Sequence, residues 1–433
     1  MGHSCTITSV TTITSVTTTT SVTTITSVTI IASVTTITNT SMTTSRHYDL
    51  IIAGAGAAGL SLVWHFLHTE GLKKKSILVA DRILQPVRDK TWCFWDDRHL
   101  PFDDLIHHTW SRLEVRVNRN VITQPLENYR YHCVKSDDYA QKILTLARGE
   151  PNVELMEADI DGFTHENGRA VMHTSKGDFT ASHIFQSVLR PPGFNKLKLD
   201  VSLLQHFEGW HIHTEKPVFD PDLATFMDFD VPQKNGVTFV YVLPFSKQDA
   251  LVEYTLFSPE VISDEAYREG LTDYLEGRLD LGPGDYEIGY TEKGAIPMED
   301  RRYPAQYCRN VWNVGTMGGL TKPSTGYTFT RIQQHSADIA ASLANGKPPP
   351  KDIMSPYRFR VYDMMLLYNL HRYPETSITI FEELFRKNRF DRILQFLEEN
   401  TRLDQEIRIM ASLPWLPFFR AMYRMKHRIV TGA

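Results

Sequence analysis

The sequence has 433 residues, a formal net charge of −5 and an ordinary globular composition, with 42% hydrophobic and 22% charged residues. This length suits one large domain or two fused domains. The lack of a basic excess argues against nucleic acid as the general partner. Four scattered cysteines without a CxxC pair indicate free thiols in a reducing compartment and give no sign of a zinc or other metal site. They are Cys5, Cys93, Cys133 and Cys308.

The first residues form a low-complexity segment. Residues 9–40 nearly repeat "TSVTTI" and carry no acidic or basic side chain. A signal peptide needs a positively charged start and a leucine- or alanine-rich core, and this segment has neither. We therefore predict a disordered or loosely extended tail over residues 1–46. Met42 begins "MTTSRHYDLIIAGAG", which suggests the hypothesis that the native chain starts there.

A nucleotide-binding pattern follows the tail. Residues 49–53 predict a buried parallel strand and residues 57–67 the helix after it, with Gly54, Gly56 and Gly59 in a GxGxxG spacing between them. Gly54 permits the tight turn, Gly56 lets the backbone approach a pyrophosphate, and Gly59 lets helix and strand pack closely. A second strand, "SILVAD", ends in Asp81, at the distance expected for a carboxylate that binds a ribose hydroxyl. Capping of the following turn is the alternative role for Asp81.

Aromatic and glycine-rich segments come next along the chain. "RDKTWCFWDD" (residues 88–97) reads as a short strand with Trp92, Phe94 and Trp95. Residues 205–210, 239–245 and 250–258 are further apolar strands, and "GAIPMED" (residues 294–300) reads as a turn. Residues 310–331 read as a strand, a glycine-rich turn and a helix. Backbone N–H groups there are candidates to face a flavin ring; they belong to Gly318, Gly319, Thr325, Gly326 and Tyr327.

In this order the segments resemble the lycopene cyclases, flavoproteins that close rings on the ends of a linear carotene. The resemblance runs from about residue 47 to residue 424. It includes the "TW.F" element at residues 91–94, the "LVE.T" strand at 251–255, the "G.IP" turn and the "P.TGY" turn at 323–327. The match is closer to the bacterial than to the plant proteins, which carry "EETS" here, because the glutamate is followed by Tyr254-Thr255.

The resemblance implies a lycopene β-cyclase that binds FAD in its reduced form, with NAD(P)H as the reductant. The reaction it implies is an isomerisation that a proton starts and that transfers no net electrons to the substrate. Such chemistry needs a carboxylic acid kept protonated in an apolar pocket. Glu253 falls at the family's catalytic acid position, inside the apolar strand "DALVEYTLF". The alternative, a glutamate on an edge strand facing water, is disfavoured by the apolar flanks and by the family position together.

The reaction also needs negative charge or π-electron density beside a carbocation. Reduced flavin would supply the charge, and aromatic side chains would line an apolar tunnel for lycopene. Glu299, in "GAIPMED", is a weaker candidate for shaping the pocket. Several of these aromatic residues have an equally good reading as plain core. The candidates for the substrate pocket are Trp92, Phe94, Phe239, Tyr241, Glu299 and Tyr327.

The carboxyl end is predicted to be helical from residue 357. Phe390, Ile393, Leu394 and Leu397 fall at i, i+3, i+4 and i+7, which indicates a helix packed on the body of the protein. In the last helix, Trp415, Phe418, Phe419 and Met422 share one face, with basic residues at 420, 424, 426 and 428 beside it. Docking on the core and lying on a membrane surface are both open. The implied substrate favours a cytoplasmic protein attached peripherally to the membrane, with no segment that spans it.

We expect an α/β fold of the glutathione-reductase type. An FAD-binding part would comprise residues 47–194 and 290–345, a mostly antiparallel substrate sheet residues 195–289, and a helical region residues 346–433. Two alternatives to a cyclase remain. One is a flavin monooxygenase or polyprenyl reductase on the same scaffold, which would consume NADPH. The other is a non-catalytic carotenoid- or flavin-binding membrane protein, in which Glu253 would be dispensable.

Overall fold

The computed structural model describes residues 46–96, 101–351 and 355–431. The predicted tail lies outside these ranges except for its last residue, and so does the hypothesis about Met42. Contacts divide the chain into residues 1–44 and residues 45–433. All that follows concerns the second unit.

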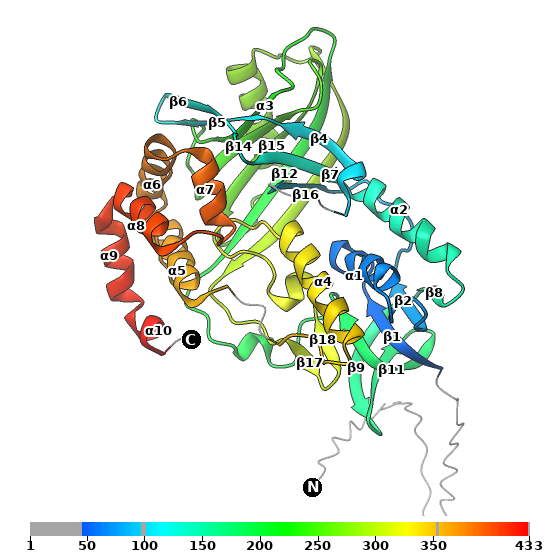
Figure 1. Cartoon of the computed structure of the whole chain (residues 1–433). Coiled ribbons are helices and arrows are strands. Elements are labelled where there is room, and N and C mark those ends of the chain that lie inside the picture. Colours follow the sequence, from blue (N-terminus) through cyan, green and yellow to red (C-terminus); the bar gives the residue numbers. More distant parts are fainter. Residues whose placement is uncertain (1–45, 97–100, 352–354, 432–433) are drawn as a thin grey trace, which may run out of the picture. The chain divides into compact units, whose positions relative to one another are not determined.

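An eight-stranded sheet carries the nucleotide-binding pattern (Figure 1). Its strands β18, β11, β1, β2 and β8 run parallel, while β17 and the strands β9 and β10 pair antiparallel at the margins. β1 and β2 read as continuous apolar runs because both faces of a parallel sheet are covered. The bounds are β1 (His47–Ala53), β2 (Ile77–Asp81), β8 (Val153–Glu157), β9 (Ile160–Glu166), β10 (Arg169–Thr174), β11 (Gly177–Gln186), β17 (Gln306–Cys308) and β18 (Val311–Asn313).

Three helices cover one face of this sheet (Figure 1). α1 (Ala57–His68) lies beside both α2 (Ser136–Gly149) and α4 (Phe329–Ala344). Their apolar sides share one buried cluster with the inner residues of β1 and β2, including Phe66, Ile143 and Phe329. The parallel sheet flanked by helices is therefore confirmed.

A seven-stranded sheet forms the second part of the fold, in the order β16-β12-β15-β14-β13-β5-β6. Its pairs are antiparallel except for β13 with β5. Alternation divides its strands into two faces. The outer face packs against α3, and the inner face joins the largest apolar cluster. The bounds are β5 (Arg112–Val117), β6 (Asn120–Pro125), β12 (Ser202–Thr214), β13 (Leu223–Asp228), β14 (Val237–Pro244), β15 (Asp249–Ser258), β16 (Tyr286–Glu299) and α3 (Asp264–Leu279).

A three-stranded sheet, β3-β7-β4, and the carboxyl-terminal helices complete the structure. The predicted stripe on α7 is confirmed, because Phe390, Ile393 and Leu394 are buried and Leu397 packs against the same cluster. The bounds are β3 (Thr91–Asp96), β4 (Ile106–Trp110), β7 (Arg130–Lys135), α5 (Tyr357–Arg372), α6 (Pro374–Lys387), α7 (Phe390–Leu397), α8 (Leu403–Ser412), α9 (Trp415–Arg424) and α10 (Lys426–Thr431), with the short 3₁₀ turns η1 (Asp103–Leu105), η2 (Phe194–Lys196) and η3 (Gly315–Gly318).

Two sequence-based expectations need correction. The predicted "G.IP" turn is wrong, because residues 294–297 lie within the long strand β16 and pair with β12. Pro297 is tolerated there since β16 is an edge strand, where a missing N–H costs no ladder bond. The expected substrate segment, residues 195–289, also differs from the observed sheet. That sheet recruits β5 and β6 from earlier in the chain and continues to Glu299.

Candidate active site

The glycine turn between β1 and α1 has the geometry that its spacing predicts. A Cβ on Gly59 would lie 1.8 Å from the carbonyl oxygen of Gly54, and Gly54 itself has φ +107°, so both positions require glycine. A Cβ on Gly56 would meet nothing within 4 Å. Gly56 is also the N-cap residue of α1, and none of the described side chains accepts a hydrogen bond from the first N–H groups of the helix there. The start of α1 is therefore open on the side where a phosphate group would bind its N–H groups.

Asp81 lies at the end of β2 and organises this turn. Its two carboxylate oxygens accept hydrogen bonds from the backbone N–H groups of Ala55, at 2.5 Å, and of Arg82, at 2.6 Å. The carboxylate thus caps the turn, which was the alternative role for it. A contact with a ribose hydroxyl stays a prediction.

The second glycine-rich turn packs against the first. A Cβ on Gly315, in η3, would lie 2.9 Å from Cβ of Ala58, at the beginning of α1. The N–H group of Gly318 donates to the carbonyl of Val314, just before η3, and that of Gly319 to the carbonyl of Thr316 within it, while those of Thr325 and Gly326 donate to the carbonyl of Lys322. These four N–H groups therefore hold the turns in shape. α4 begins only at residue 329.

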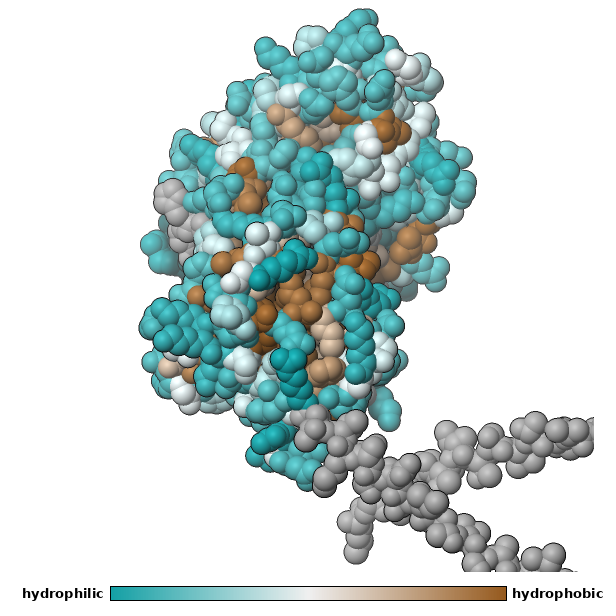
Figure 2. All heavy atoms as spheres, turned by 90° about the vertical axis from the view of Figure 1, so that its right-hand side faces the viewer, coloured by the Kyte–Doolittle hydropathy of each residue, from teal (hydrophilic) through white to brown (hydrophobic). Residues whose placement is uncertain are grey.

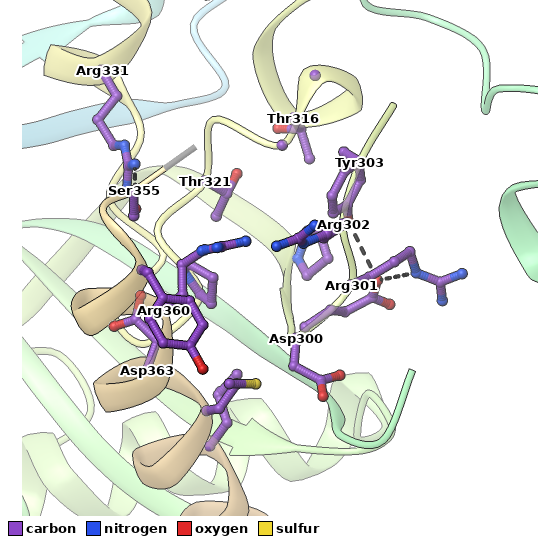
Figure 3. A pocket seen from close by; sticks show the side chains of 18 residues that line it. Asp300, Arg301, Arg302, Tyr303, Thr316, Thr321, Arg331, Ser355, Arg360 and Asp363 are labelled. Carbon is purple, nitrogen blue, oxygen red and sulfur yellow. Dashed lines mark hydrogen bonds and ion pairs between the residues drawn. The ribbon is translucent and has the colours of Figure 1, made fainter. Parts of the chain in front are cut away.

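A cavity lies beside this turn and contains positive charge (Figure 3). It encloses about 840 Å³, part of it open to solvent. Arg302 and Arg360 extend towards each other from opposite walls, while Arg331 donates to Ser355 at 2.8 Å (Figure 3). Thr316, Gly318, Gly319 and Pro323 line the same space. Converging guanidinium groups suit an anionic ligand.

Glu299 lies at the edge of this cavity, but its carboxylate is already engaged. Oε2 accepts from the guanidinium of Arg301 at 2.7 Å, and Oε1 accepts from the hydroxyl of Ser202 at 3.1 Å. Its neighbour on β16, Met298, belongs to the inner face of the second sheet. Glu299 therefore points away from that face.

Glu253 lies on the inner face of β15, in the row where Tyr241 of β14 and Gly209 of β12 are its direct partners. The side chain is half-buried, and apolar side chains surround it on the same face. Removal from water, together with repulsion from the carboxyl of Glu292, raises the pKa of Glu253 to about 8. A hydrogen bond from Thr255, at 2.8 Å, opposes this effect. Glu253 therefore holds its proton at neutral pH.

Aromatic side chains gather next to Glu253. The hydroxyls of Tyr131 and Tyr327 are 2.9 Å apart, and the ring of Tyr327 is 4.4 Å from that of Trp95. Burial raises the pKa of Tyr241, and the charge of Glu253 raises it further. Phe239 packs edge-on against Tyr241. Three predicted pocket residues, Phe239, Tyr241 and Tyr327, thus lie in one cluster with Glu253.

Trp92 and Phe94 lie on the opposite face of β3. Trp92 packs on Phe329 and Tyr139, and Phe94 stacks on Phe329, so both belong to the cluster under α1 and α4. The intervening residues, Cys93 and Trp95, face the Glu253 side. Sequence reasoning missed Tyr131, Gly209 and Glu292 as members of the site. Only the register of the strands brings them together.

Helices α8 and α9 expose an apolar surface, which we call the α8–α9 surface. Trp415 and Phe419 are 67% and 57% exposed, and Leu403 and Ile407 of α8 are similarly exposed. Arg428 is not part of its basic margin, contrary to expectation, because it is 1% exposed and pairs with Asp200 and Asp300. In the described part of the chain no helix is long and apolar enough to cross a bilayer. The apolar residues are Leu403, Ile407, Trp415, Leu416, Phe419, Met422 and Tyr423.

The face seen in Figure 2 has a different character. It is largely hydrophilic, with apolar side chains collected in its middle and hydrophilic residues around them (Figure 2).

The fold is that of the FAD-dependent oxidoreductases and monooxygenases. A flavoprotein/dehydrogenase of Cytophaga hutchinsonii superposes with a TM-score of 0.57 at 12% identity, covering 85% of this chain and 99% of that one. A geranylgeranyl bacteriochlorophyll reductase-like protein of Thermoplasma acidophilum gives 0.55 at 13% identity, covering 88% and 99%. At these identities the likeness concerns the fold alone.

The sequence narrows this class to one family. Residues 49–423 match the family described as "Lycopene cyclase protein". A lycopene beta-cyclase of Pseudescherichia vulneris is 26% identical over 322 residues, which cover 70% of this chain and 75% of that protein. One of Pantoea ananas is 26% identical over 295 residues, covering 65% and 71%. The chain belongs to the lycopene cyclase family, as its motifs predicted.

Proposed function

We propose that this protein is a lycopene β-cyclase that uses FAD and converts the linear ends of lycopene into β-rings. The observation that carries this proposal is Glu253, a carboxyl with a pKa of about 8 on a sheet face lined with aromatic rings. An acid of this kind is protonated at neutral pH and lies in apolar surroundings, so it is suited to give its proton to a carbon–carbon double bond.

Glu253 begins the proposed reaction by giving its proton to the terminal double bond of the acyclic end. The neighbouring double bond then attacks the resulting cation and closes the ring. The faces of Tyr241, Tyr327 and Trp95 offer π-electron density to the cation. Their packing also excludes water, which would otherwise trap the cation as an alcohol.

The residues around the two glycine turns fit FAD. The open start of α1 at Gly56 would receive the pyrophosphate, and Asp81 lies beside it. The cavity with Arg302 and Arg360 would receive the more distal part of the cofactor. When bound in its reduced state, with NAD(P)H as reductant, the flavin would supply negative charge near the cation.

Two surface features support access for a membrane-resident substrate. A hollow lined by residues 397–400 reaches Trp95 and Tyr327, at the edge of the aromatic cluster. The α8–α9 surface exposes apolar side chains beside the basic residues Arg420 and Arg424. That combination suits a helix lying on an anionic bilayer, so the protein would be cytoplasmic and attached peripherally to the membrane.

Pigment analysis in cells that accumulate lycopene tests the function. We expect the full-length chain to convert lycopene into γ- or β-carotene, and Glu253→Gln to abolish conversion. Glu208→Gln is the matched control, because Glu208 is a buried glutamate on β12 that faces the other side of the sheet and bonds Trp210. Unchanged lycopene with the wild-type chain would contradict the proposal.

Two further readouts separate the alternatives. Net consumption of NADPH in proportion to product would favour a monooxygenase or reductase. Full activity of Glu253→Gln would remove Glu253 as the acid.

A further inference from the structure

A second glutamate lies in the same row as Glu253. On the inner face, Glu253 of β15 pairs with Gly209 of β12, and Gly209 pairs with Glu292 of β16. The two glutamates are thus two strands apart, about 10 Å between their Cα atoms at ordinary strand spacing. A Cβ on Gly209 would lie 3.2 Å from Cγ of Glu292 and 3.5 Å from Cβ of Glu253. Cδ1 of Leu251 would lie closer still, at 2.8 Å, so Gly209 itself places no side chain between the two glutamates, but the side chain of Leu251 packs over it.

Glu292 is buried without the partners that buried carboxylates need. It is 3% exposed. Among residues 46–96, 101–351 and 355–431 it is the one carboxyl whose two oxygens are both buried without a hydrogen bond. Nε2 of His211 lies 3.7 Å from Oε1, beyond hydrogen-bond length.

Two other buried acids, Asp391 and Glu406, are well satisfied. Asp391 accepts from three backbone N–H groups, and Glu406 accepts two bonds from the guanidinium of Arg358. An unsatisfied buried carboxyl costs stability, so a contribution to the fold does not account for Glu292.

We propose that Glu292 is the proton acceptor of the cyclisation and forms, with Glu253 across Gly209, a carboxyl pair that shares one proton. This inference rests on the proposed function and adds a residue to it. Both carboxyl groups lie on the sheet face that carries the aromatic cluster. They could therefore act on the same end of one substrate molecule.

The proton balance closes within the pair. Glu253 gives one proton to the terminal double bond, a carbon–carbon bond forms, and the positive charge moves to a ring carbon. Glu292 then removes one proton from the carbon next to that charge, which forms the ring double bond. The proton returns from Glu292 to Glu253 over Gly209. The product is an isomer of the substrate, and no oxidant, reductant or other co-reactant is consumed.

The electrostatics of the neighbourhood agree with this division of roles. The carboxyl of Glu292 raises the pKa of Glu253, which keeps the proton on the donor. Burial lowers the pKa of His211, although Glu292 opposes this effect, so the imidazole is neutral at pH 7 and gives Glu292 no positive charge. The titratable groups that interact electrostatically with Glu292 are Tyr290 on its own strand, His211 and Glu253 on β12 and β15, and Cys93 and Cys133 on β3 and β7 of the three-stranded sheet.

The proposal is tested with purified full-length enzyme, FAD and lycopene in vesicles. The turnover number, the pH profile of activity and the ratio of ring isomers in the product are measured. We expect Glu292→Gln to lower kcat by about 100-fold or more, with KM little changed. We also expect a larger share of other ring isomers, because another group must take the proton. The alkaline limb of the residual activity should move to lower pH, since Glu253 loses a neighbouring negative charge. Glu292→Asp should recover part of the rate.

Glu208→Gln is again the matched control. We expect it to have the turnover number, the isomer ratio and the alkaline limb of the pH profile of the wild type. Gly209→Ala provides a second route should Glu292→Gln fold poorly, since its Cβ would press on Leu251 and on Glu292. Its control is Gly289→Ala on β16, the strand of Glu292, where the nearest atom to a Cβ is 3.7 Å away. If Glu292→Gln has the same kcat, the same isomer ratio and the same alkaline limb of the pH profile as the wild type, the inference is overturned while the proposed function stays intact.

A readout without turnover separates failure of this inference from failure of the proposed function. Infrared titration follows the carboxyl band that disappears in Glu253→Gln. We expect its midpoint to fall in Glu292→Gln. A wild-type enzyme that leaves lycopene unchanged would refute the function, whereas an unmoved midpoint would refute the pair.

Discussion

The hydroxyl of Thr255 donates a 2.8 Å hydrogen bond to Oε1 of Glu253, two residues earlier on the same face of β15. Such a bond favours the ionised carboxylate and lowers the pKa of Glu253, whereas burial and Glu292 raise it to about 8. Burial is the largest of the three effects. The position of the protonation equilibrium therefore depends on a balance that single substitutions can move in either direction.

The first prediction concerns the pH dependence of activity. Because the proposed mechanism uses protonated Glu253 as the acid, cyclisation should fall on the alkaline side through an ionisation near pH 8. Thr255→Val removes a bond to the ionised form, so its alkaline limb should lie at higher pH. A pH profile of kcat/KM checks both. A limb that moves to lower pH in Thr255→Val would show that this bond stabilises the protonated acid instead.

The second prediction concerns the stability that Glu253 costs. Its pKa is about 8 in the folded protein and 4.5 in the unfolded chain. Below pH 4.5 both states are protonated and nothing is lost. Between pH 4.5 and 8 only the unfolded chain ionises, so stability falls with rising pH and then levels off. The full penalty is at most about 5 kcal/mol.

Denaturant unfolding as a function of pH measures this penalty. Glu253→Gln should be as stable as wild type at pH 4 and more stable by a few kcal/mol at pH 9, although the proposed mechanism predicts that it is inactive. Glu208→Gln should show no such gain. Equal stability of Glu253→Gln and wild type at both pH values would mean that the carboxyl is solvated.

The third prediction separates two glycines of the nucleotide turn. Gly56→Ala adds a Cβ into open space, so the fold should tolerate it, but the methyl group would occupy the approach of a pyrophosphate. Gly59→Ala would place a Cβ 1.8 Å from a carbonyl oxygen and should prevent folding of the turn. We expect Gly56→Ala to keep its Tm without cofactor and to lose about tenfold or more in FAD affinity. Flavin fluorescence and thermal unfolding report the two effects.

Strong affinity for FAD in Gly56→Ala would place the pyrophosphate elsewhere. A folded Gly59→Ala would show that β1 and α1 can separate by the distance that a methyl group needs.

The sequence predicted the features that depend on local patterns. The strand, glycine turn and helix around Gly54 follow from the geometry of single residues, and Glu253 stands out because it interrupts an apolar strand. Features that depend on strand register were missed. Glu292 and Gly209 become neighbours of Glu253 only when β12 pairs with both β15 and β16. The β3 strand shows the same limit, because alternation separates Trp92 from Trp95 but does not tell which face meets the site.

The last prediction concerns membrane attachment through the α8–α9 surface. Each exposed apolar side chain that enters the bilayer interface contributes about 1.5–3 kcal/mol at most. Replacing Trp415 and Phe419 together by serine should therefore lower binding to anionic vesicles by at least tenfold, while soluble detergent assays of cyclisation stay near wild type. Val121→Ser, an equally exposed apolar residue on β6, is the control. Binding should also weaken with salt, because Arg420 and Arg424 flank the surface. Co-sedimentation with vesicles measures this binding. If the double variant binds as well as the wild type, the protein attaches to the membrane through another face.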